Sequence, residues 1–272
     1  MFKDSPLNWQ TTGIYIYLAL GSVYSLFVEW NVFFILLGLF HYIWFGLASS
    51  MYYHRTITHG ALKLKLPVEM FFLLGGLIGL GGDPVRWATL HRVHHRRSDQ
   101  PRDPHSPKVS FWYAYFGWVS RWDDKLIAPY RENICKDLDK NILYSIWRIP
   151  LLEGIPHFLY AGILWHFIGW NHLVYVLLFP ILLTFNFHWG LIASLCHLPS
   201  LGKQRYDVGD NSRNIKGLSL LTFGESMHNN HHKFPNAMNF GDNRGEWDFS
   251  CYVAKALQKA GLASDIKIVS YE

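Results

Sequence analysis

The sequence predicts an all-α integral membrane protein: four transmembrane helices, paired as two helical hairpins, under a cytosolic helical cap that holds a cluster of histidines. Half of the 272 residues are hydrophobic and 17% are aromatic. The apolar residues are gathered into long runs, as in membrane proteins, and are not spread at amphipathic spacing. Histidines recur in short groups beside those runs. We expect a single domain over residues 1–272.

Four apolar runs are predicted to cross the membrane, since each is near the roughly 20 residues that a helix needs to span about 30 Å of hydrocarbon. They are residues 14–28, 32–50, 151–168 and 173–196. The tips of the two hairpins, residues 29–31 and 169–172, each carry a Trp, which suits the membrane interface, and neither carries Lys or Arg. A shorter run with Glu69 and several glycines, residues 66–80, is expected to lie on the interface.

Basic residues predict which side the cap is on. The segment between the hairpins is rich in Lys and Arg, so the positive-inside rule puts both termini and the cap, residues 54–150 and 197–272, in the cytosol. The three cysteines are not at C-x-x-C spacing, so we expect reduced thiols in a reducing compartment. The first residues do not resemble a signal peptide, because they carry Asp4 and no small-residue cleavage site follows.

The first histidine group, HRTITH, follows the second predicted span. Its histidines, His54 and His59, are five residues apart, and an α-helix would turn them about 140° from each other. The two imidazoles could therefore serve two metals, or the helix could deform there. The fourth span likewise ends on a histidine, His197, after a similar length of helix.

The second and third groups share the pattern H-x-x-H-H. The second follows Asp83-Pro84, which is typical of a helix start. The third follows Thr222-x-x-Glu225, which is typical of a capping box. Spacings of three and four residues put the imidazoles of each group on one helix face. These six residues are His91, His94, His95, His228, His231 and His232.

Nine histidines at one membrane depth favour metal binding. Crowded imidazoles cannot all be protonated, and unpaired buried polar groups are costly, so divalent metals would remove both problems. Nine nitrogens exceed the needs of one tetrahedral zinc but suit two centres, and imidazole is a good ligand for iron. His105 lies in a DPHSP turn and is not counted as a ligand. The other histidines are expected to be ordinary core or surface residues: His41, His157, His166, His172 and His188.

The boxes HRTITH, HRVHH and HNNHH, in this order and with this membrane layout, resemble the membrane fatty acid desaturases of the stearoyl-CoA (delta-9) type. GDPVRWATLHRVHHRRSDQPRDPHSP is similar to the central stretch of bacterial members, and GESMHNNHHKFP to their third box. The resemblance covers nearly the whole chain. It implies a di-iron centre that uses O2 and two electrons to form a cis double bond in a fatty acyl chain, with no catalytic residues beyond the metal ligands.

Residue by residue, the resemblance implies nine iron ligands: His54, His59, His91, His94, His95, His197, His228, His231 and His232. The family's asparagine, which can hold a water near one iron, is Ala193 here, so the resemblance does not extend to that contact. The implied substrate is a fatty acyl-CoA or an acyl-lipid. The implied partners are membrane lipid and an external electron donor of the ferredoxin or cytochrome b5 type, without nucleic acid, and the implied location is a bacterial inner membrane.

Polar residues near the boxes could contact the phosphates of CoA or a phospholipid head group, or could orient metal-bound imidazoles through their other nitrogen. Equally, the basic ones could only hold positive charge near anionic lipid, and the loop at residues 204–214 could be only structural. The candidates are Arg86, Arg92, Arg96, Asp99, Arg205, Asp210, Asn211 and Arg213.

Other functions remain as alternatives. A fatty acyl or lipid hydroxylase with the same boxes is the closest, because hydroxylation differs from desaturation by small changes around one oxidant. A zinc hydrolase would need a general base such as the Glu of H-E-x-x-H, which the sequence lacks; Glu225 is expected to be a helix cap. A transporter would place ionisable residues near the middle of the bilayer, whereas the boxes lie at the cytosolic ends.

Overall fold

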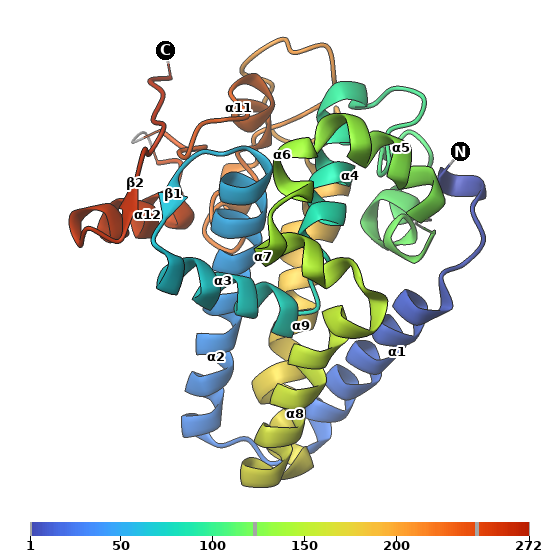
Figure 1. Ribbon diagram of the computed structural model, residues 1–272, viewed down its shortest axis with the longest axis vertical. Helices are drawn as coiled ribbons and strands as arrows, with labels where there is room; N and C mark the ends of the chain where they lie inside the picture. Colours follow the sequence, from blue (N-terminus) through green and yellow to red (C-terminus); the bar gives the residue numbers. More distant parts are fainter. Residues whose placement is uncertain (1, 122–123, 243–244, 272) are drawn as a thin grey trace.

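The computed structural model describes residues 2–121, 124–242 and 245–271, and these are mostly helical (Figure 1). This confirms the predicted helical class. The α-helices are α1 (Trp9–Tyr24), α2 (Val32–Leu47), α3 (Leu66–Ile78), α4 (Pro84–Arg97), α5 (Asp124–Ile134), α6 (Lys136–Asp139), α7 (Ile142–Ser145), α8 (Pro150–Leu173), α9 (Phe179–Thr184), α10 (Leu191–Leu195), α11 (His228–Lys233) and α12 (Phe249–Lys259). Two short strands, β1 (Lys63–Leu64) and β2 (Ala263–Ser264), pair antiparallel, with Lys63 opposite Ser264.

Segments of π-helix join several of these helices into longer rods. The segment Ala48–Thr58 continues α2. Two more, Val174–Leu178 and Phe185–Gly190, lie on either side of α9. Helical backbone therefore runs well past residue 50, where the second predicted span ends.

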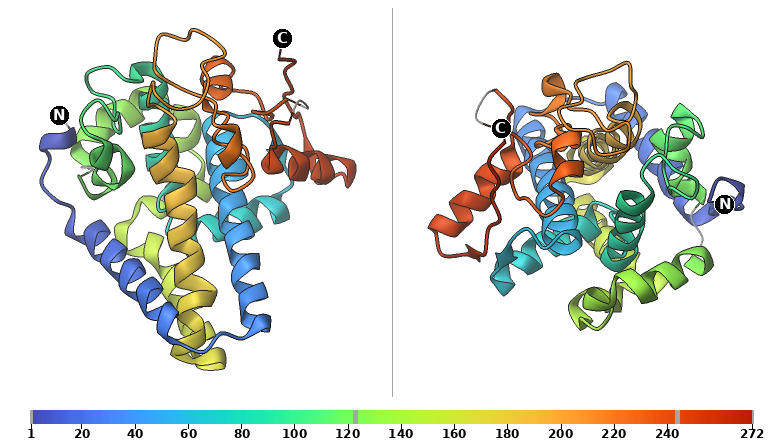
Figure 2. Two further views of the ribbon diagram at one scale, coloured as in Figure 1. Left: turned by 180° about the vertical axis from the view of Figure 1, so that it is seen from behind. Right: turned by 90° about the horizontal axis from the view of Figure 1, so that it is seen from above.

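By length and composition, two helices of the described chain could cross a membrane, Val32–Thr58 and Leu152–Leu195. The second, of 44 residues, contains Gly169 with φ 74°, a backbone angle that glycine adopts freely. The chain reverses there, at the predicted tip of the second hairpin, and α8 and the rod through α9 form two antiparallel arms (Figure 2).

The helix α1 begins five residues before the first predicted span. Asn8 caps it, because its side-chain oxygen accepts a hydrogen bond from the backbone N–H of Thr11 at 3.1 Å. The helix packs against Val174–Leu178 and α9. At 16 residues α1 is shorter than the two long helices.

The run predicted to lie at the interface forms α3, which crosses the long rods and packs on α2, its π-helical extension and α8 (Figure 1). Glycines allow the close approach. A Cβ added at Gly75 would lie 2.5 Å from Nε1 of Trp44, and one added at Gly76 would clash with the ring of Tyr53. Leu73 and Leu77, on the same helix, are fully buried.

The described termini, α4 and α11 lie at one end of the molecule, and the tips of the helical arms lie at the other (Figures 1 and 2). Large apolar side chains are exposed along the arms, among them Phe33, Phe40, Phe158 and Phe167. Soluble monomers rarely expose large contiguous apolar surfaces. This surface therefore suits contact with lipid tails.

Candidate metal site

His54 and His59 lie at the end of the π-helical segment Ala48–Thr58. A π-helix has i→i+5 hydrogen bonds, and the hydroxyl of Thr58 also donates to the carbonyl of Tyr53, five residues earlier, at 2.8 Å. Residues five apart therefore point in similar directions, and the centroids of the two imidazoles are 5.1 Å apart. The sequence allowed two possibilities for this pair, service to two metals or a deformed helix, and the structure has the deformed helix.

The helix α4 starts as predicted and carries the second group. The carboxylate of Asp83 accepts from the backbone N–H of Val85 at 2.8 Å, and proline occupies the first helical position. Along this helix, His91 and His95 face one cluster of imidazoles and His94 faces another. One short helix thus serves both clusters.

The third group lies on α11, which spans only His228–Lys233. The predicted capping box at Thr222 is wrong, because no side chain caps this helix. Glu225 is instead buried and accepts hydrogen bonds from His54 and Arg55. Arg55, a charged partner from a distant segment of the chain, binds this carboxylate more strongly than a local backbone N–H would.

The two asparagines of the HNNHH box fix a neighbouring loop to α11. The side-chain oxygen of Asn229 accepts from the backbone N–H of Arg205 at 2.7 Å, and that of Asn230 accepts from the amide of Asn214 at 2.7 Å. Both asparagines are fully buried. The loop that carries Asp210 is therefore held in a defined position beside the histidines.

The structure brings the nine predicted histidines together as two neighbouring sets. The fivefold set consists of His54, His59, His91, His95 and His231, and the fourfold set of His94, His197, His228 and His232. Within each set, one ring nitrogen of every member lies within 4.8 Å of the others. The ring centroids of His95 and His232, from different sets, are 4.6 Å apart, so the sets are adjacent.

The Nε2 atoms converge within each set. In the fivefold set, Nε2 of His95 is 2.8 Å from Nε2 of His231. In the fourfold set, Nε2 of His228 is 3.0 Å from Nε2 of both His197 and His232. Each set thus points several nitrogens at a common position, as ligands around a metal do.

Carboxylates bind the opposite ring nitrogen, Nδ1, of four of these histidines. The pairs are His54–Glu225 at 2.5 Å, His94–Asp103 at 2.9 Å, His197–Asp99 at 3.0 Å and His232–Asp210 at 2.6 Å. A neutral imidazole that donates from Nδ1 carries a lone pair on Nε2.

With this tautomer, lone pairs on neighbouring rings repel each other unless a metal ion lies between them. Nε2 of His94 and Nε2 of His232 both carry lone pairs and face each other at 3.3 Å. Two lone pairs at this distance repel, and a cation between them removes the repulsion. In the fivefold set, Nε2 of His59 is buried and has no hydrogen-bond partner among the described residues. The donor sets therefore fit metal ions, and the carboxylates orient the rings as they do around bound metals.

The ionisation states agree with this arrangement. Burial alone would raise the pKa of Asp210 and Glu225, but His232 and His54 outweigh it, so the pKa of Asp210 falls far below its usual value and that of Glu225 falls to about 2. Burial keeps the pKa of Asp103 raised. Burial and neighbouring groups, chiefly other imidazoles, lower the pKa of most of the histidines well below the usual value, which leaves them neutral, as ligands must be: His59, His91, His94, His95, His228 and His231.

Glu225 belongs to a buried ionic network that the sequence analysis missed. Arg55 is fully buried; it donates to Asp248 at 2.7 Å and to Glu225 at 3.2 Å. The hydroxyl of Ser50 also donates to Glu225, at 2.5 Å. The only signal for this network in the sequence is that an arginine stands inside the first box, directly after His54.

His105 lies closer to the site than its turn suggests. It is buried, and its ring centroid is 4.1 Å from that of His94. Together with Asp103 these side chains form a further group with metal-binding spacing. Asp103, however, already accepts from Nδ1 of His94, so His105 remains outside both sets.

Most of the predicted head-group residues have partners within the protein. Arg86 pairs with Glu153, Arg92 with Asp137, Arg205 with Asp242, Arg213 donates to Gln204, and the backbone of Asn211 donates to Asp99. Arg96, on α4, is exposed. Among these candidates, Asp99 and Asp210 contact the histidines directly.

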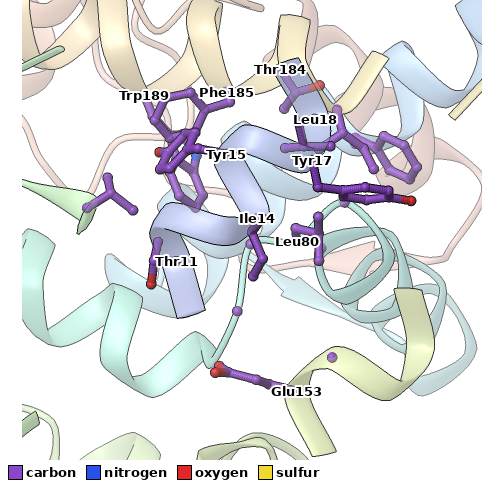
Figure 3. A pocket seen from close by; sticks show the side chains of 18 of the residues that line it. Thr11, Ile14, Tyr15, Tyr17, Leu18, Leu80, Glu153, Thr184, Phe185 and Trp189 are labelled. Carbon is purple, nitrogen blue, oxygen red and sulfur yellow. The ribbon is translucent and has the colours of Figure 1, made fainter. Parts of the chain in front are cut away.

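Two cavities share the side chain of Trp189, and the smaller of them contacts the histidine sets. The larger, of about 570 Å³, lies between α1, α3 and α9 and is lined mainly by apolar side chains such as Ile14, Leu18 and Phe185 (Figure 3). Its volume is typical of small-ligand pockets. The smaller, of about 50 Å³, touches members of both sets. Trp189 lines both cavities, and its indole N–H donates to the hydroxyl of Ser49 at 3.0 Å.

Comparison with known proteins gives a consistent result. A family model described as fatty acid desaturase matches residues 28–240. The chain is 34% identical to an acyl-CoA 5-desaturase of Anemone leveillei, over 96% of this chain and 82% of the relative. It is 33% identical to delta-9 acyl-lipid desaturase 1 of Arabidopsis thaliana, over 83% and 72%, and 30% identical to the sn-1 stearoyl-lipid 9-desaturase of Anabaena variabilis, over 96% and 94%.

Proposed function

The chain belongs to the fatty acid desaturase family, and we propose from this premise that it is a membrane-bound, O2-dependent desaturase that introduces a cis double bond at the Δ9 position of a fatty acyl chain. One observation carries the proposal: two adjacent sets of converging histidine nitrogens line a small cavity that shares Trp189 with a larger apolar cavity, which can hold a lipid tail. The comparisons include acyl-CoA and acyl-lipid desaturases, so either carrier suits the chain.

The nine histidines would hold two iron ions. The fivefold set would bind one ion and the fourfold set the other, and the carboxylates on Nδ1 would hold the rings in place. Histidine is a good ligand for iron, and four or five imidazoles leave positions open for oxygen. When bound there, the iron pair supplies the oxidising power to remove hydrogen from an unactivated methylene, which no side-chain acid or base can do.

The reaction balances with an external source of electrons. Two adjacent methylenes lose one hydrogen each, with two electrons in total, and a carbon–carbon double bond forms. O2 takes up these two hydrogens together with two further electrons and two protons, and leaves as two waters. The further electrons would come from a partner of the ferredoxin or cytochrome b5 type that docks on the cap.

The protein's own residues would position the acyl chain and exclude water. The larger cavity offers an apolar wall from Ile14 and Leu18 on α1 and from Phe185 near α9 (Figure 3). Trp189 lines this larger cavity and also the smaller cavity beside the histidines, so the two cavities share one side chain. A chain that lies in this cavity would present its methylenes to the metal site in a fixed orientation, which lowers the entropy cost of the reaction.

The two long apolar helices and the family indicate a membrane protein. We further propose that the four arms α1, α2, α8 and α9 to α10 all span the bilayer, as two hairpins. Residues 54–150 and 197–272 would then form the cap of a single domain, with both termini in the cytosol of a bacterium and the arms in its inner membrane. The exposed phenylalanines of the arms support contact with lipid.

Expression in a host that lacks its own desaturase tests the function directly. Gas chromatography with mass spectrometry of the host's fatty acids should reveal new monounsaturated chains, with the double bond at Δ9. Hydroxylated chains in their place would identify the alternative, a hydroxylase. Unchanged fatty acids from a folded, iron-loaded protein with a supplied electron donor would contradict both.

A further inference from the structure

His188 departs from the expectation that it is an ordinary core histidine. It lies in the π-helical segment Phe185–Gly190 and is 6% exposed. Neither of its ring nitrogens has a hydrogen-bond partner among the described residues. Its ring packs edge-on against Phe223, with centroids 5.0 Å apart. In contrast, both nitrogens of the buried His41 are paired, with a backbone carbonyl and with Tyr160.

The imidazole of His188 lines the smaller cavity beside the histidine sets. The polar members of the cavity wall include His54 of the fivefold set, His228 of the fourfold set and Glu225. Much of the remaining wall is aromatic or aliphatic, Ala193 included. His188 itself belongs to neither set.

Two unpaired nitrogens on one buried ring are unfavourable in an apolar environment, because burial removes their hydrogen bonds to water and nothing replaces them. Water removes this cost where a cavity is large enough and polar enough. A water needs roughly 10–15 Å³ of such volume and two to four polar partners. The cavity measures about 50 Å³, and His188 and Glu225 are polar groups in its wall, beside members of both sets.

A neutral imidazole suits this task, because one nitrogen donates and the other accepts. The fourfold set also has room for such a water. It provides one imidazole fewer than the fivefold set, so more positions around its metal remain for other ligands. Its member His228 faces the cavity that His188 faces.

We propose that His188 is a positioning residue: it holds a water molecule in the small cavity between the two sets and presents that water to the metal of the fourfold set. The proposal rests on the metal site of the proposed function. It assigns to His188, five residues before Ala193 on the same helical rod, the placement of that water.

The test compares His188→Phe, which cannot bond to water, with His188→Gln, which can still donate and accept. Each full-length variant is purified in detergent and loaded with cobalt(II). We expect His188→Phe to bind as many metal ions per chain as the unmodified protein, because none of the nine histidines changes. Its visible cobalt absorption should become stronger, since losing a water lowers the coordination number. Desaturation in cells should fall about 10- to 100-fold.

His188→Gln should keep the cobalt spectrum of the unmodified protein. His157→Phe is the matched control: His157 is buried, also has an unpaired nitrogen, and lines neither cavity, so its loss should leave the spectrum unchanged. If His188→Phe does not accumulate, the smaller His188→Leu gives the same comparison.

An unchanged cobalt spectrum in His188→Phe or His188→Leu would overturn the proposal, and so would the loss of a metal ion, which would make His188 a ligand. Neither result touches the proposed function. That function fails separately, if the unmodified protein binds no metal or forms no double bond.

Discussion

At the scale of single residues, the fixed orientation of their rings distinguishes the histidines of the site from imidazoles that only lie close together. Imidazoles that merely crowd together would have variable tautomers. Here Asp99 and Asp210 each hold the Nδ1 of one ring, so the Nε2 atoms of His197 and His232 present lone pairs to the centre of the fourfold set. The carboxylates thus prepare the site before any metal arrives.

Replacing Asp210 by Asn should weaken metal binding about 10- to 100-fold, because an amide can donate to Nδ1 and stabilise the wrong tautomer of His232. Competition with a chelator, using cobalt(II) on the purified protein, measures the change. Asp207→Asn is the control, since Asp207 is exposed and its carboxylate accepts from the backbone N–H of the nearby Gly209, not from a histidine among the described residues. Equal affinities in the two variants would contradict the role of Asp210.

His94→Ala should abolish desaturation and lower the metal content, while the protein still inserts into the membrane. His94 contributes to the fourfold set and is 1% exposed, so no solvent ligand can easily replace it. Fatty acid analysis and metal analysis of the same membranes measure both effects. His166→Ala, on the exposed face of α8, should behave like the unmodified protein. Full activity of His94→Ala would contradict the role of the fourfold set in desaturation.

At the scale of the elements, apolar runs and helix-start signals located α2, α3 and α4 within a few residues but could not give the type of helix, and they predicted nothing for α5, α6, α7 and α12. The apolar run after Asn31 predicted α2 correctly from its first residue. The switch to π-helix at Ala48 depends on packing against α3, α4 and α12, which local propensity does not contain. It is this switch that brings His54 and His59 into one set.

The sequence also could not predict which carboxylates bond to the ring nitrogens of the histidines. Asp99 and Asp210 were candidates because they stand near the boxes. Glu225, in contrast, has a spacing typical of a capping box, yet its partners Arg55 and His54 lie about 170 residues away. Contacts over such separations leave no local pattern in one sequence.

The packing of α3 predicts a mutational effect at this scale. Gly76→Ala should destabilise the protein by about 1–3 kcal/mol, because its Cβ would clash with the ring of Tyr53 and push α3 away from the bundle. Thermal unfolding in detergent measures the change. Gly162→Ala on α8 is the control: apart from its own stretch of helix, nothing described lies within 4 Å of the added Cβ, so it should cause no loss. Equal stability of the two variants would contradict the tight packing of α3.

At the scale of the whole molecule, α4 and α11, which carry six of the nine histidines, lie with the described termini at the end opposite the tips of the arms (Figure 1). The proposed electron donor is a cytosolic protein, so the proposal requires this end to face the cytosol. The exposed tip residue Glu29 and the exposed Lys259 on α12 should therefore lie on opposite sides of the membrane.

A membrane-impermeant maleimide should label Glu29→Cys in intact spheroplasts and Lys259→Cys only after the membrane is opened. The three native cysteines give a low background, because Cys135, Cys196 and Cys251 are all buried. Labelling of Lys259→Cys in intact spheroplasts would show that the orientation is the reverse.

Both α4 and α11 supply histidines to both sets: His91 and His94 on α4, for example, belong to different ones. The first iron to bind would therefore immobilise two helices that also carry ligands for the second, and would lower the entropy cost of the next binding event. Loading should be cooperative, with few chains carrying a single ion. When iron is scarce, cells would then contain a mixture of complete and empty enzymes, and activity would follow the number of complete ones.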